Sequence, residues 1–365
     1  MADKLLTVIV PAYNMEEYLP KCLESLLVDD KELLLNLDVI VVNDGSKDRT
    51  SEIAHGFEAK YPNVFRVIDK ENGHYGSCIN AALPVAQGVY VKVLDADDSF
   101  DTKGLASFLS TLSDIINAPR NDIDVVFTDY VRVALDGKEI NRYPLTLPQN
   151  ERTSLTQMPD GDIRDLWMQS VTYRTQMVRD ADYCQMEGVP FTDQEWVFYP
   201  MTFVRGAYYF PVVVYKYLCG RDGQTIDPVY YVKNFSVIRM ITQKQINAYP
   251  HLLNVATEGG NNYISTRLYA RAMLVYARHI VQSRHELYGE QKELREFDDD
   301  LKSTVPDIYE RTGNTRYFRH IPIKYVNAWR RHSIGGAFEL LLLLYFFIPL
   351  SNAVWKMKRL TMASH

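Results

Sequence analysis

The chain has 365 residues, of which 47% are hydrophobic and 24% are charged, and its formal net charge is -6. This length favours one large domain with an appendage, and the composition is that of a globular protein, which excludes a largely disordered chain. The net negative charge argues against binding to the nucleic-acid backbone, so we expect no nucleic-acid partner.

The N-terminal part of the chain alternates strand and helix patterns joined by short loops. Runs rich in β-branched residues predict four strands, over 5–10, 39–42, 64–68 and 89–94. Apolar residues at helical spacing predict helices over 16–27 and 46–59, the second capped by Ser46. This rhythm predicts an α/β fold with a mostly parallel central sheet flanked by helices. Such sheets bind ligands at the carboxyl ends of their strands.

Further along the chain the pattern changes from strands to helices. Strands are predicted over 125–133 and 212–217, and residues 230–301 are predicted to be helical, with 263–287 as one clear helix. We therefore expect three parts. They are an α/β domain over 1–225, a helical extension over 226–332, and an apolar and basic tail over 333–365.

Two motifs lie at predicted strand ends. In VPAYN (10–14) a proline ends a buried strand, and the following loop can present Tyr13 to a ligand; an ordinary strand-to-helix turn is the alternative. In VVNDGS (41–46) the carboxylate of Asp44 would lie at the edge of the sheet, where it can accept hydrogen bonds from a base or a ribose. Alternatively, Asp44 or Ser46 caps the next helix.

The glycine-rich motif ENGHYG (71–76) does not match a known phosphate-binding pattern. It lacks the G-K-[ST] of a P-loop, and its spacing differs from the dinucleotide-binding fingerprint. A plain loop is the simpler interpretation. His74 has no second histidine at metal-ligand spacing, so we do not expect it to bind a metal.

Three aspartates in LDADD (94–98) follow a run that is predicted to be a buried strand. Like charges this close repel one another, so either the aspartates form a solvated loop tip or a cation holds them. Magnesium or manganese is typically bound by one or two carboxylates together with substrate phosphates. The motif therefore favours a metal site and a substrate that carries a diphosphate.

The motif PFTDQEW (190–196) places Asp193 and Glu195 among aromatic residues. Apolar surroundings raise the pKa of a carboxyl group towards the range of a general base. The alternative is that Asp193 caps a helix that runs through Val197, and the two roles are compatible.

Together these motifs resemble the family-2 glycosyltransferases, which have the nucleotide-sugar-binding GT-A fold. The resemblance rests on the order of the motifs, which are VIVPAYN, VVNDGSKDRT, an N-G motif that ends at Asn80, LDADD, and a single TDQE. It covers residues 4–220 and implies that the domain 1–225 is catalytic. Two departures are the Ile79 that replaces a common arginine and the lack of Q-x-x-R-W, which implies that one sugar is added per encounter.

The resemblance implies a role for each candidate residue. The donor would be contacted by Pro11, Tyr13, Asp44, Asn72, Gly73 and Asp95. Asp97 would hold Mn²⁺ or Mg²⁺ on the diphosphate, and Asp193 would be the catalytic base. Asp98 is left as a supporting residue. Arg221 lies where relatives often have a basic loop and could contact the diphosphate; an ordinary surface arginine is the alternative.

The implied reaction is a metal-dependent, inverting transfer of one sugar. The donor would be a nucleoside-diphosphate sugar, most simply a UDP-sugar, and the acceptor a hydroxyl group of a glycan or lipid-linked molecule in polysaccharide biosynthesis. Two alternatives are a nucleotidyltransferase, which has no need of Asp193, and a catalytically silent subunit that binds a sugar nucleotide and tethers a partner.

The segment 334–350 is apolar except for Glu339 and has basic residues on both sides. It is shorter than the roughly 20 residues that usually span a bilayer. We expect a helix that lies in the membrane face, with its basic neighbours on anionic lipid. A buried or homo-oligomer-forming helix and a true span are the alternatives.

Two further features bear on location. The four cysteines are scattered without a C-x-x-C pair, which gives no indication of a zinc or redox site. The N-terminus lacks the pattern of a signal peptide. We therefore expect a cytoplasmic protein at the inner face of the cell membrane.

Overall fold

The computed structural model describes residues 4–221, 224, 228–282, 291–316, 323–331 and 340. The chain forms two compact units. Unit 1 comprises 1–241 with 253–264, and unit 2 comprises 242–252 with 265–365. The apolar segment 334–350, apart from Leu340, lies outside the described residues.

The first half of the sheet in unit 1 is parallel, as predicted. It contains β1 (Lys4–Ala12), β2 (Leu37–Asn43), β3 (Phe65–Asp69) and β4 (Gly88–Val93), in the order β3-β2-β1-β4. Every residue of β2 is buried. Strands that are buried on both faces read as continuous apolar runs, which is why the sequence reveals them.

The second half of the sheet is mixed, which differs from a mostly parallel sheet. Here β9 (Val171–Arg174) lies antiparallel between β4 and β6 (Val125–Val133), and β10 (Ala207–Leu218) pairs in parallel with β6. Three antiparallel strands complete it, β5 (Ser99–Phe100), β7 (Glu139–Tyr143) and β8 (Arg152–Thr153). Apolar periodicity identifies a strand but carries no information on its direction. The sequence therefore could not show that several of these strands are antiparallel.

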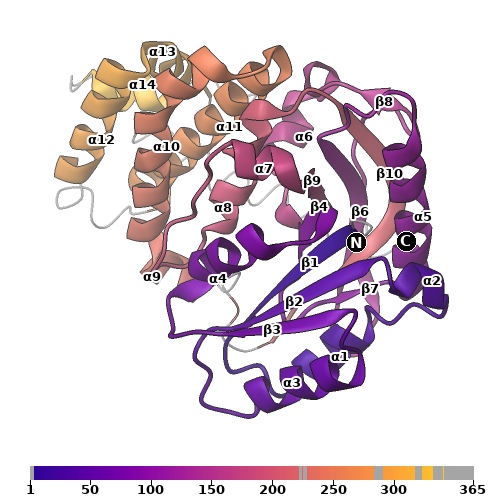
Figure 1. Ribbon diagram of the computed structural model, residues 1–365. Coiled ribbons are helices and arrows are strands. Elements are labelled where there is room, and N and C mark those ends of the chain that lie inside the picture. The colour runs from indigo at the N-terminus through magenta and orange to yellow at the C-terminus, as the bar shows by residue number, and fades with distance from the viewer. Residues whose placement is uncertain are drawn as a thin grey trace, which may run out of the picture. The chain divides into compact units, whose positions relative to one another are not determined.

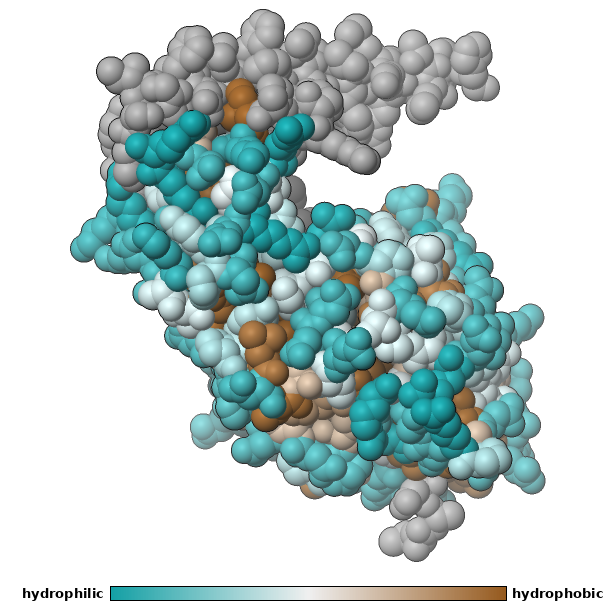
Figure 2. All heavy atoms as spheres, turned by 90° about the horizontal axis from the view of Figure 1, so that it is seen from above, coloured by the Kyte–Doolittle hydropathy of each residue, from teal (hydrophilic) through white to brown (hydrophobic). Residues whose placement is uncertain are grey.

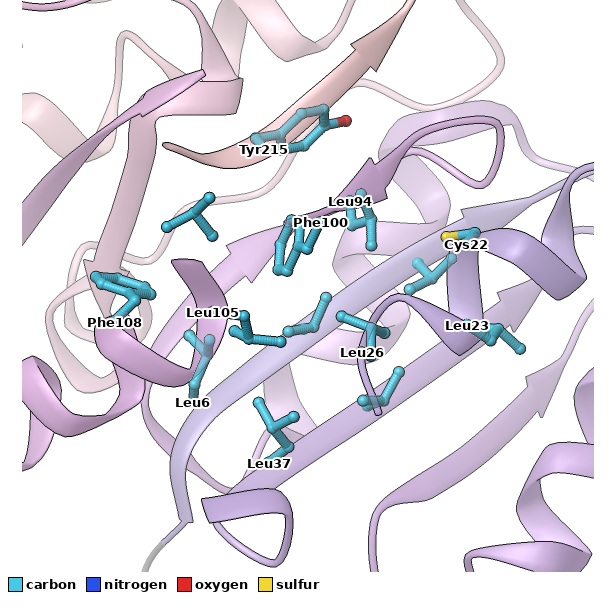
Figure 3. Close-up of a cluster of buried hydrophobic side chains, with 14 of the residues drawn as sticks. Leu6, Cys22, Leu23, Leu26, Leu37, Leu94, Phe100, Leu105, Phe108 and Tyr215 are labelled. Atoms are coloured by element: carbon cyan, nitrogen blue, oxygen red, sulfur yellow. The ribbon is translucent and has the colours of Figure 1, made fainter. Parts of the chain in front are cut away.

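Helices cover both faces of the sheet (Figure 1). On one face lie α1 (Leu19–Glu24), α3 (Thr50–Lys60) and α5 (Thr102–Asn117), and α4 (His74–Ala82) packs against β1 and β2 from the other. Figure 3 shows the first interface, where Leu23 of α1, Leu26 just after it and Leu105 of α5 point towards Leu6 and Leu37 of the strands. This core supports the edge of the sheet at which the candidate site lies.

Two helix boundaries differ from prediction. The helix expected over 16–27 is shorter, because Pro20 stands at its first turn and favours a start there. The helix expected from Ser46 begins at Thr50, and Ser46 does not cap it. The Ser46 hydroxyl instead accepts a hydrogen bond from the backbone N–H of Asn14.

Short helices connect the remaining strands of unit 1. The α-helices are α2 (Lys31–Leu34), α6 (Asp160–Asp165), α7 (Thr175–Asp180), α8 (Asp193–Trp196) and α9 (Pro228–Lys233). The 3-10 helices are η1 (Leu83–Val85), η2 (Leu155–Gln157), η3 (Met168–Ser170) and η4 (Pro200–Phe203). Figure 2 shows that hydrophilic residues cover most of one visible face, with hydrophobic residues in small patches.

Most of the described residues after 228 are helical, as the sequence predicts for 230–301. The elements are α10 (Phe235–Val255), α11 (Glu258–Tyr276), a π-helix (Ala277–Gln282), α12 (Gln291–Thr304), α13 (Pro306–Gly313) and α14 (Tyr325–Arg330). Within unit 2, Arg330 forms an ion pair with Asp298 at 2.7 Å and stacks on Tyr309. No helix among the described residues is long and apolar enough to cross a membrane.

Candidate active site

The candidate residues Tyr13, Asp44 and Asp95 follow three parallel strands that lie side by side, β1, β2 and β4. Pro11 does not end β1 as predicted, because the strand continues to Ala12 and Pro11 pairs with Val42 of β2. A proline is tolerated here because the pairing of β1 with β4 has already ended at Ile9. Tyr13 is 45% exposed in the loop that follows.

The carboxylate of Asp44 is buried and joins β2 to the glycine-rich segment. Its Oδ1 accepts hydrogen bonds from Lys70 Nζ at 2.8 Å and from the backbone N–H of Gly73 at 2.9 Å. Lys70 neutralises its charge. All of these bonds use Oδ1, so a nucleotide would have to bond with Oδ2. The helix-cap alternative for Asp44 is wrong, since α3 begins after Arg49.

The loops after β1 and β2 are tied to each other. Asn14 has a positive φ of 53°, and its Oδ1 accepts from the backbone N–H of Lys47 at 2.8 Å. Gly45 has a φ of 73°, and a Cβ there would lie 2.9 Å from the backbone nitrogen of the exposed Asn72. The motifs VPAYN, VVNDGS and ENGHYG therefore form one continuous rim at the strand ends.

The three aspartates of LDADD form a cluster. One ligand oxygen from each of Asp95, Asp97 and Asp98 lies within 4.8 Å of the others. Asp98 is buried, and its two oxygens accept from the Tyr215 hydroxyl at 2.6 Å and from the backbone N–H of Leu218 at 2.7 Å. Protein donors thus use both oxygens of Asp98, as a supporting residue would have them.

Asp95 is the least satisfied of the three. Its Oδ1 is inaccessible to solvent and accepts no hydrogen bond from the residues that the structure describes. Burial, followed by the charges of Asp97 and Asp193, raises the pKa of Asp95 to about 8. The solvated-loop interpretation is therefore wrong for this carboxyl group. An orphaned buried oxygen beside a second carboxylate suits a divalent cation.

Asp97 already has a cationic neighbour. Nε of Arg221 donates to Oδ2 of Asp97 at 2.9 Å, and Nη2 lies 2.8 Å from the same oxygen. The guanidinium also lies over the ring of Tyr18, 5.4 Å from its centroid. Arg221 is therefore no ordinary surface arginine, since its side chain is only 19% exposed.

Asp193 is the first residue of α8, and Thr192, not Asp193, stands at the cap position. Its charge contributes to the raised pKa of Asp95, after burial and the charge of Asp97. Gln194 donates to Oδ2 of Asp193 at 3.1 Å. Glu195 has a different role. It is fully buried, and its carboxylate accepts a hydrogen bond from the backbone N–H of Met186 at 2.7 Å.

Sequence reasoning missed several residues that build this site. Tyr75 lies in the glycine-rich motif, and its hydroxyl interacts with Asp95 and donates to Sδ of Met168 at 3.0 Å. Asn80 holds the segment before Asp193, since it exchanges two hydrogen bonds with the backbone of Gln185. The second Asn of the N-G motif was a signal for Asn80, whereas nothing in the sequence points to Tyr75.

Lys92 of β4 was also missed. It is completely buried, and its Nζ donates to the carbonyl oxygens of Gln169 at 2.7 Å and Val171 at 3.2 Å. No carboxylate among the described residues pairs with it, and burial lowers the pKa of this amine to about 7. Lys92 fastens β4, which leads to the aspartate cluster, to the segment that carries Met168.

Comparison with known proteins agrees with this geometry. Residues 7–178 match the family model described as glycosyl transferase family 2. An uncharacterized glycosyltransferase of Mycoplasma pneumoniae is 42% identical over 98 residues, which cover 26% of this chain and 32% of the relative. EpsJ of Bacillus subtilis, also an uncharacterized glycosyltransferase, is 28% identical over 198 residues, which cover 52% of this chain and 53% of EpsJ. The chain thus spans between a third and about half of these curated relatives.

Solved structures share the fold. The crystal structure of S. aureus TarS 1-349 has a TM-score of 0.60 at 20% identity and covers 83% of this chain and 82% of that chain. The same fragment in complex with UDP-GlcNAc has a TM-score of 0.58 at 20% identity, with the same coverage. The predicted fold class is confirmed. Residues 7–178 form a glycosyltransferase family 2 domain, and the chain has the GT-A fold.

Proposed function

We propose that this chain is a metal-dependent, inverting glycosyltransferase that moves one sugar from a UDP-sugar to an acceptor hydroxyl group. The observation that carries the proposal is the cluster of Asp95, Asp97 and Asp98 at the end of a parallel strand, where one ligand oxygen from each lies within 4.8 Å of the others. Such a cluster suits a divalent cation on a diphosphate, and Asp193 is the candidate for the base that a single displacement requires. Family membership and the UDP-GlcNAc bound to TarS support the reaction class and the donor.

The carboxylates fit a divalent cation of the size of Mn²⁺ or Mg²⁺. Asp97 and the orphaned Oδ1 of Asp95 offer hard oxygen ligands on one loop, whereas both oxygens of Asp98 already accept hydrogen bonds from the protein. Such ions keep positions for substrate phosphates. When bound, the ion would neutralise the charge that develops on the departing diphosphate.

Residues of the chain would bind the nucleotide and take up the proton of the acceptor. Pro11, Tyr13, Asp44, Asn72 and Gly73 line the rim at the strand ends and would bind the nucleotide, with Oδ2 of Asp44 as an acceptor. Asp193 would accept the proton of the acceptor hydroxyl as its oxygen bonds to the anomeric carbon. The bond from that carbon to the diphosphate oxygen breaks in the same step, on the opposite face. One displacement inverts the configuration.

We propose a glycan or lipid-linked acceptor in polysaccharide biosynthesis, held near the cytoplasmic face of the membrane. The support is the sequence of the tail, in which basic residues flank the apolar segment 334–350. That segment lies outside the described residues except for Leu340.

The test supplies the full chain with UDP-, GDP- and dTDP-sugars, Mn²⁺ or Mg²⁺, and detergent-solubilised lipid acceptors, and follows release of nucleoside diphosphate. We expect release from a UDP-sugar that EDTA and Asp97→Ala abolish. Loss of the base in Asp193→Asn should lower the rate by about 10²–10⁴-fold. Asp136→Asn, at an exposed turn, is the matched control and should be unchanged.

Other outcomes separate the alternatives. Release of pyrophosphate that persists in Asp193→Asn would favour a nucleotidyltransferase. A chain that binds UDP but releases no diphosphate from any donor would favour the catalytically silent subunit. Either result contradicts the proposed transfer.

A further inference from the structure

Asp97, a candidate metal ligand, already has one of its two oxygens in use. Both the Nε and Nη2 atoms of Arg221 lie within 2.9 Å of Oδ2. The carboxylate is 13% exposed and the guanidinium 19% exposed, so this is a largely desolvated ion pair. In such surroundings a divalent cation and a guanidinium on the same oxygen would repel each other strongly.

We propose that Arg221 is a built-in counter-ion of Asp97, which a divalent cation displaces, and that the released guanidinium then binds the diphosphate of the donor. The inference rests on the proposed function, because it concerns the metal and donor of that same site. Before the donor arrives, Arg221 stabilises the cluster of Asp95, Asp97 and Asp98. Afterwards, the diphosphate supplies negative charge to the ion and to Arg221 alike.

The surroundings of Arg221 favour movement of its side chain rather than its backbone. The backbone N–H groups of Gly220 and Arg221 donate to Oε1 of Gln224 at 3.0 and 3.2 Å. The amide of Gln224 in turn donates to the carbonyl of Leu218 at 2.7 Å, and the N–H of Leu218 is fixed on Asp98. The base of the arginine is therefore anchored.

Tyr18 gives the released guanidinium a second contact. The Cζ atom of Arg221 lies 5.4 Å from the centroid of the Tyr18 ring, within the range of a cation–π interaction. Tyr18 stands just before α1, on the loop that follows Tyr13. An arginine that leaves Asp97 can therefore stay at the rim where we propose that the nucleotide binds.

The exchange makes metal and nucleotide binding cooperative. Without a diphosphate, an incoming ion must break the ion pair between Arg221 and Asp97, so it binds weakly. A bound diphosphate removes that cost, and by linkage the ion strengthens nucleotide binding by the same factor. Arg221→Gln removes the competitor, so it should strengthen binding of the metal alone while it weakens binding of the nucleotide.

Titration of the full chain with Mn²⁺ alone, UDP alone, and Mn²⁺ in the presence of UDP tests this, with free Mn²⁺ followed by electron paramagnetic resonance. In the wild type, UDP should tighten Mn²⁺ binding by at least about fivefold, a typical coupling. In Arg221→Gln, Mn²⁺ alone should bind at least about fivefold tighter, UDP should bind more weakly, and the coupling should approach one. Arg142→Gln, which breaks another arginine–aspartate pair in unit 1, should match the wild type.

Two results would overturn the exchange. The first is that Arg221→Gln binds Mn²⁺ alone no more tightly than the wild type does. The second is that UDP does not change the Mn²⁺ affinity of the wild type. The second needs no variant, so it decides the matter even if Arg221→Gln does not fold. If Mn²⁺ binds neither protein with or without UDP, the proposed metal dependence fails along with the exchange. If Mn²⁺ and UDP bind and sugar is transferred without coupling, only the exchange fails.

Discussion

The hydroxyl of Tyr215 donates to Oδ2 of Asp98 at 2.6 Å and accepts from the backbone N–H of Asp95 at 3.1 Å. The ring of Tyr215 belongs to the hydrophobic core, beside Phe100 in Figure 3. One side chain thus joins the core of unit 1 to the loop that carries the candidate metal ligands.

We expect Tyr215→Phe to destabilise the chain by about 2 kcal/mol, because it leaves a buried carboxylate oxygen and a backbone N–H without their partner. Chemical denaturation measures this difference. Tyr143→Phe is the control, since its stack on Tyr130, with centroids 4.5 Å apart, does not need the hydroxyl. Equal stability of the two variants would contradict the role given to Tyr215.

Lys92 should make stability depend on pH. Burial lowers its pKa from 10.5 to about 7 in the folded chain, so between these values the unfolded chain binds a proton that the folded chain does not. The free energy of unfolding should therefore rise with pH across this window, by up to about 1.4 kcal/mol per unit. Below pH 7 both states are protonated and the full cost of burying the charge remains.

Denaturation of the wild type and of Lys92→Met at pH 6, 7, 8 and 9 measures the effect. The variant lacks the titrating amine, so the stability of the wild type relative to the variant should increase as pH rises from 7 to 9. A constant difference would show that Lys92 keeps an ordinary pKa. Other titrating groups contribute to both proteins and cancel.

Gly76 and Gly56 should respond to alanine with opposite signs, although both lie inside helices. A Cβ at Gly76 would lie 2.0 Å from the carbonyl oxygen of Met186, whereas a Cβ at Gly56 meets nothing within 4 Å. Gly56→Ala should stabilise by about 0.5–1 kcal/mol, as helix propensity predicts. Gly76→Ala should destabilise by about 1–3 kcal/mol, because backbone must move.

Activity gives a second measurement at Gly76. The displaced segment is the one that Asn80 holds ahead of Asp193, so Gly76→Ala should also slow sugar transfer, while Gly56→Ala should not. A stable and fully active Gly76→Ala variant would show that the close approach to Met186 does not position the site.

The tail should hold the chain at the membrane. Deletion of 333–365 removes the apolar and basic segment, so we expect the protein to move from the membrane fraction to the soluble fraction. A control deletes only 360–365, which lie beyond the last basic residue, Arg359. If the longer deletion leaves the protein with the membranes, the tail is not the anchor.

The sequence predicted the strands of unit 1 well because buried parallel strands are continuous runs of β-branched residues. The aspartate cluster was also visible, since its members are neighbours along the chain. Residues that reach the cluster from elsewhere were harder to predict. Tyr215 is 117 positions from Asp98, and its sequence context is that of any buried strand.

Helix starts and carboxylate roles were less predictable for a different reason. Ser46, Asp44 and Asp193 are all good capping residues by type, yet α3 and α8 begin beside Arg49 and Thr192. Each of the three polar side chains has a tertiary partner or neighbour instead. Helix-capping propensity is a local property, so it cannot show whether a side chain will cap a helix or bind a residue that is distant in the sequence. For the same reason it could not show that Glu195 accepts a hydrogen bond from the backbone of Met186.

The pair of Asp97 and Arg221 also bears on how the chain acquires its structure. The two residues are 124 positions apart, so at about 5–20 residues per second roughly 6–25 s of synthesis separate them. For most of that interval the nascent aspartate cluster has neither the guanidinium of Arg221 nor the hydroxyl of Tyr215. A fragment cut before residue 221 would keep this uncompensated charge. The smallest stable catalytic fragment should therefore extend past Gln224, which anchors the arginine.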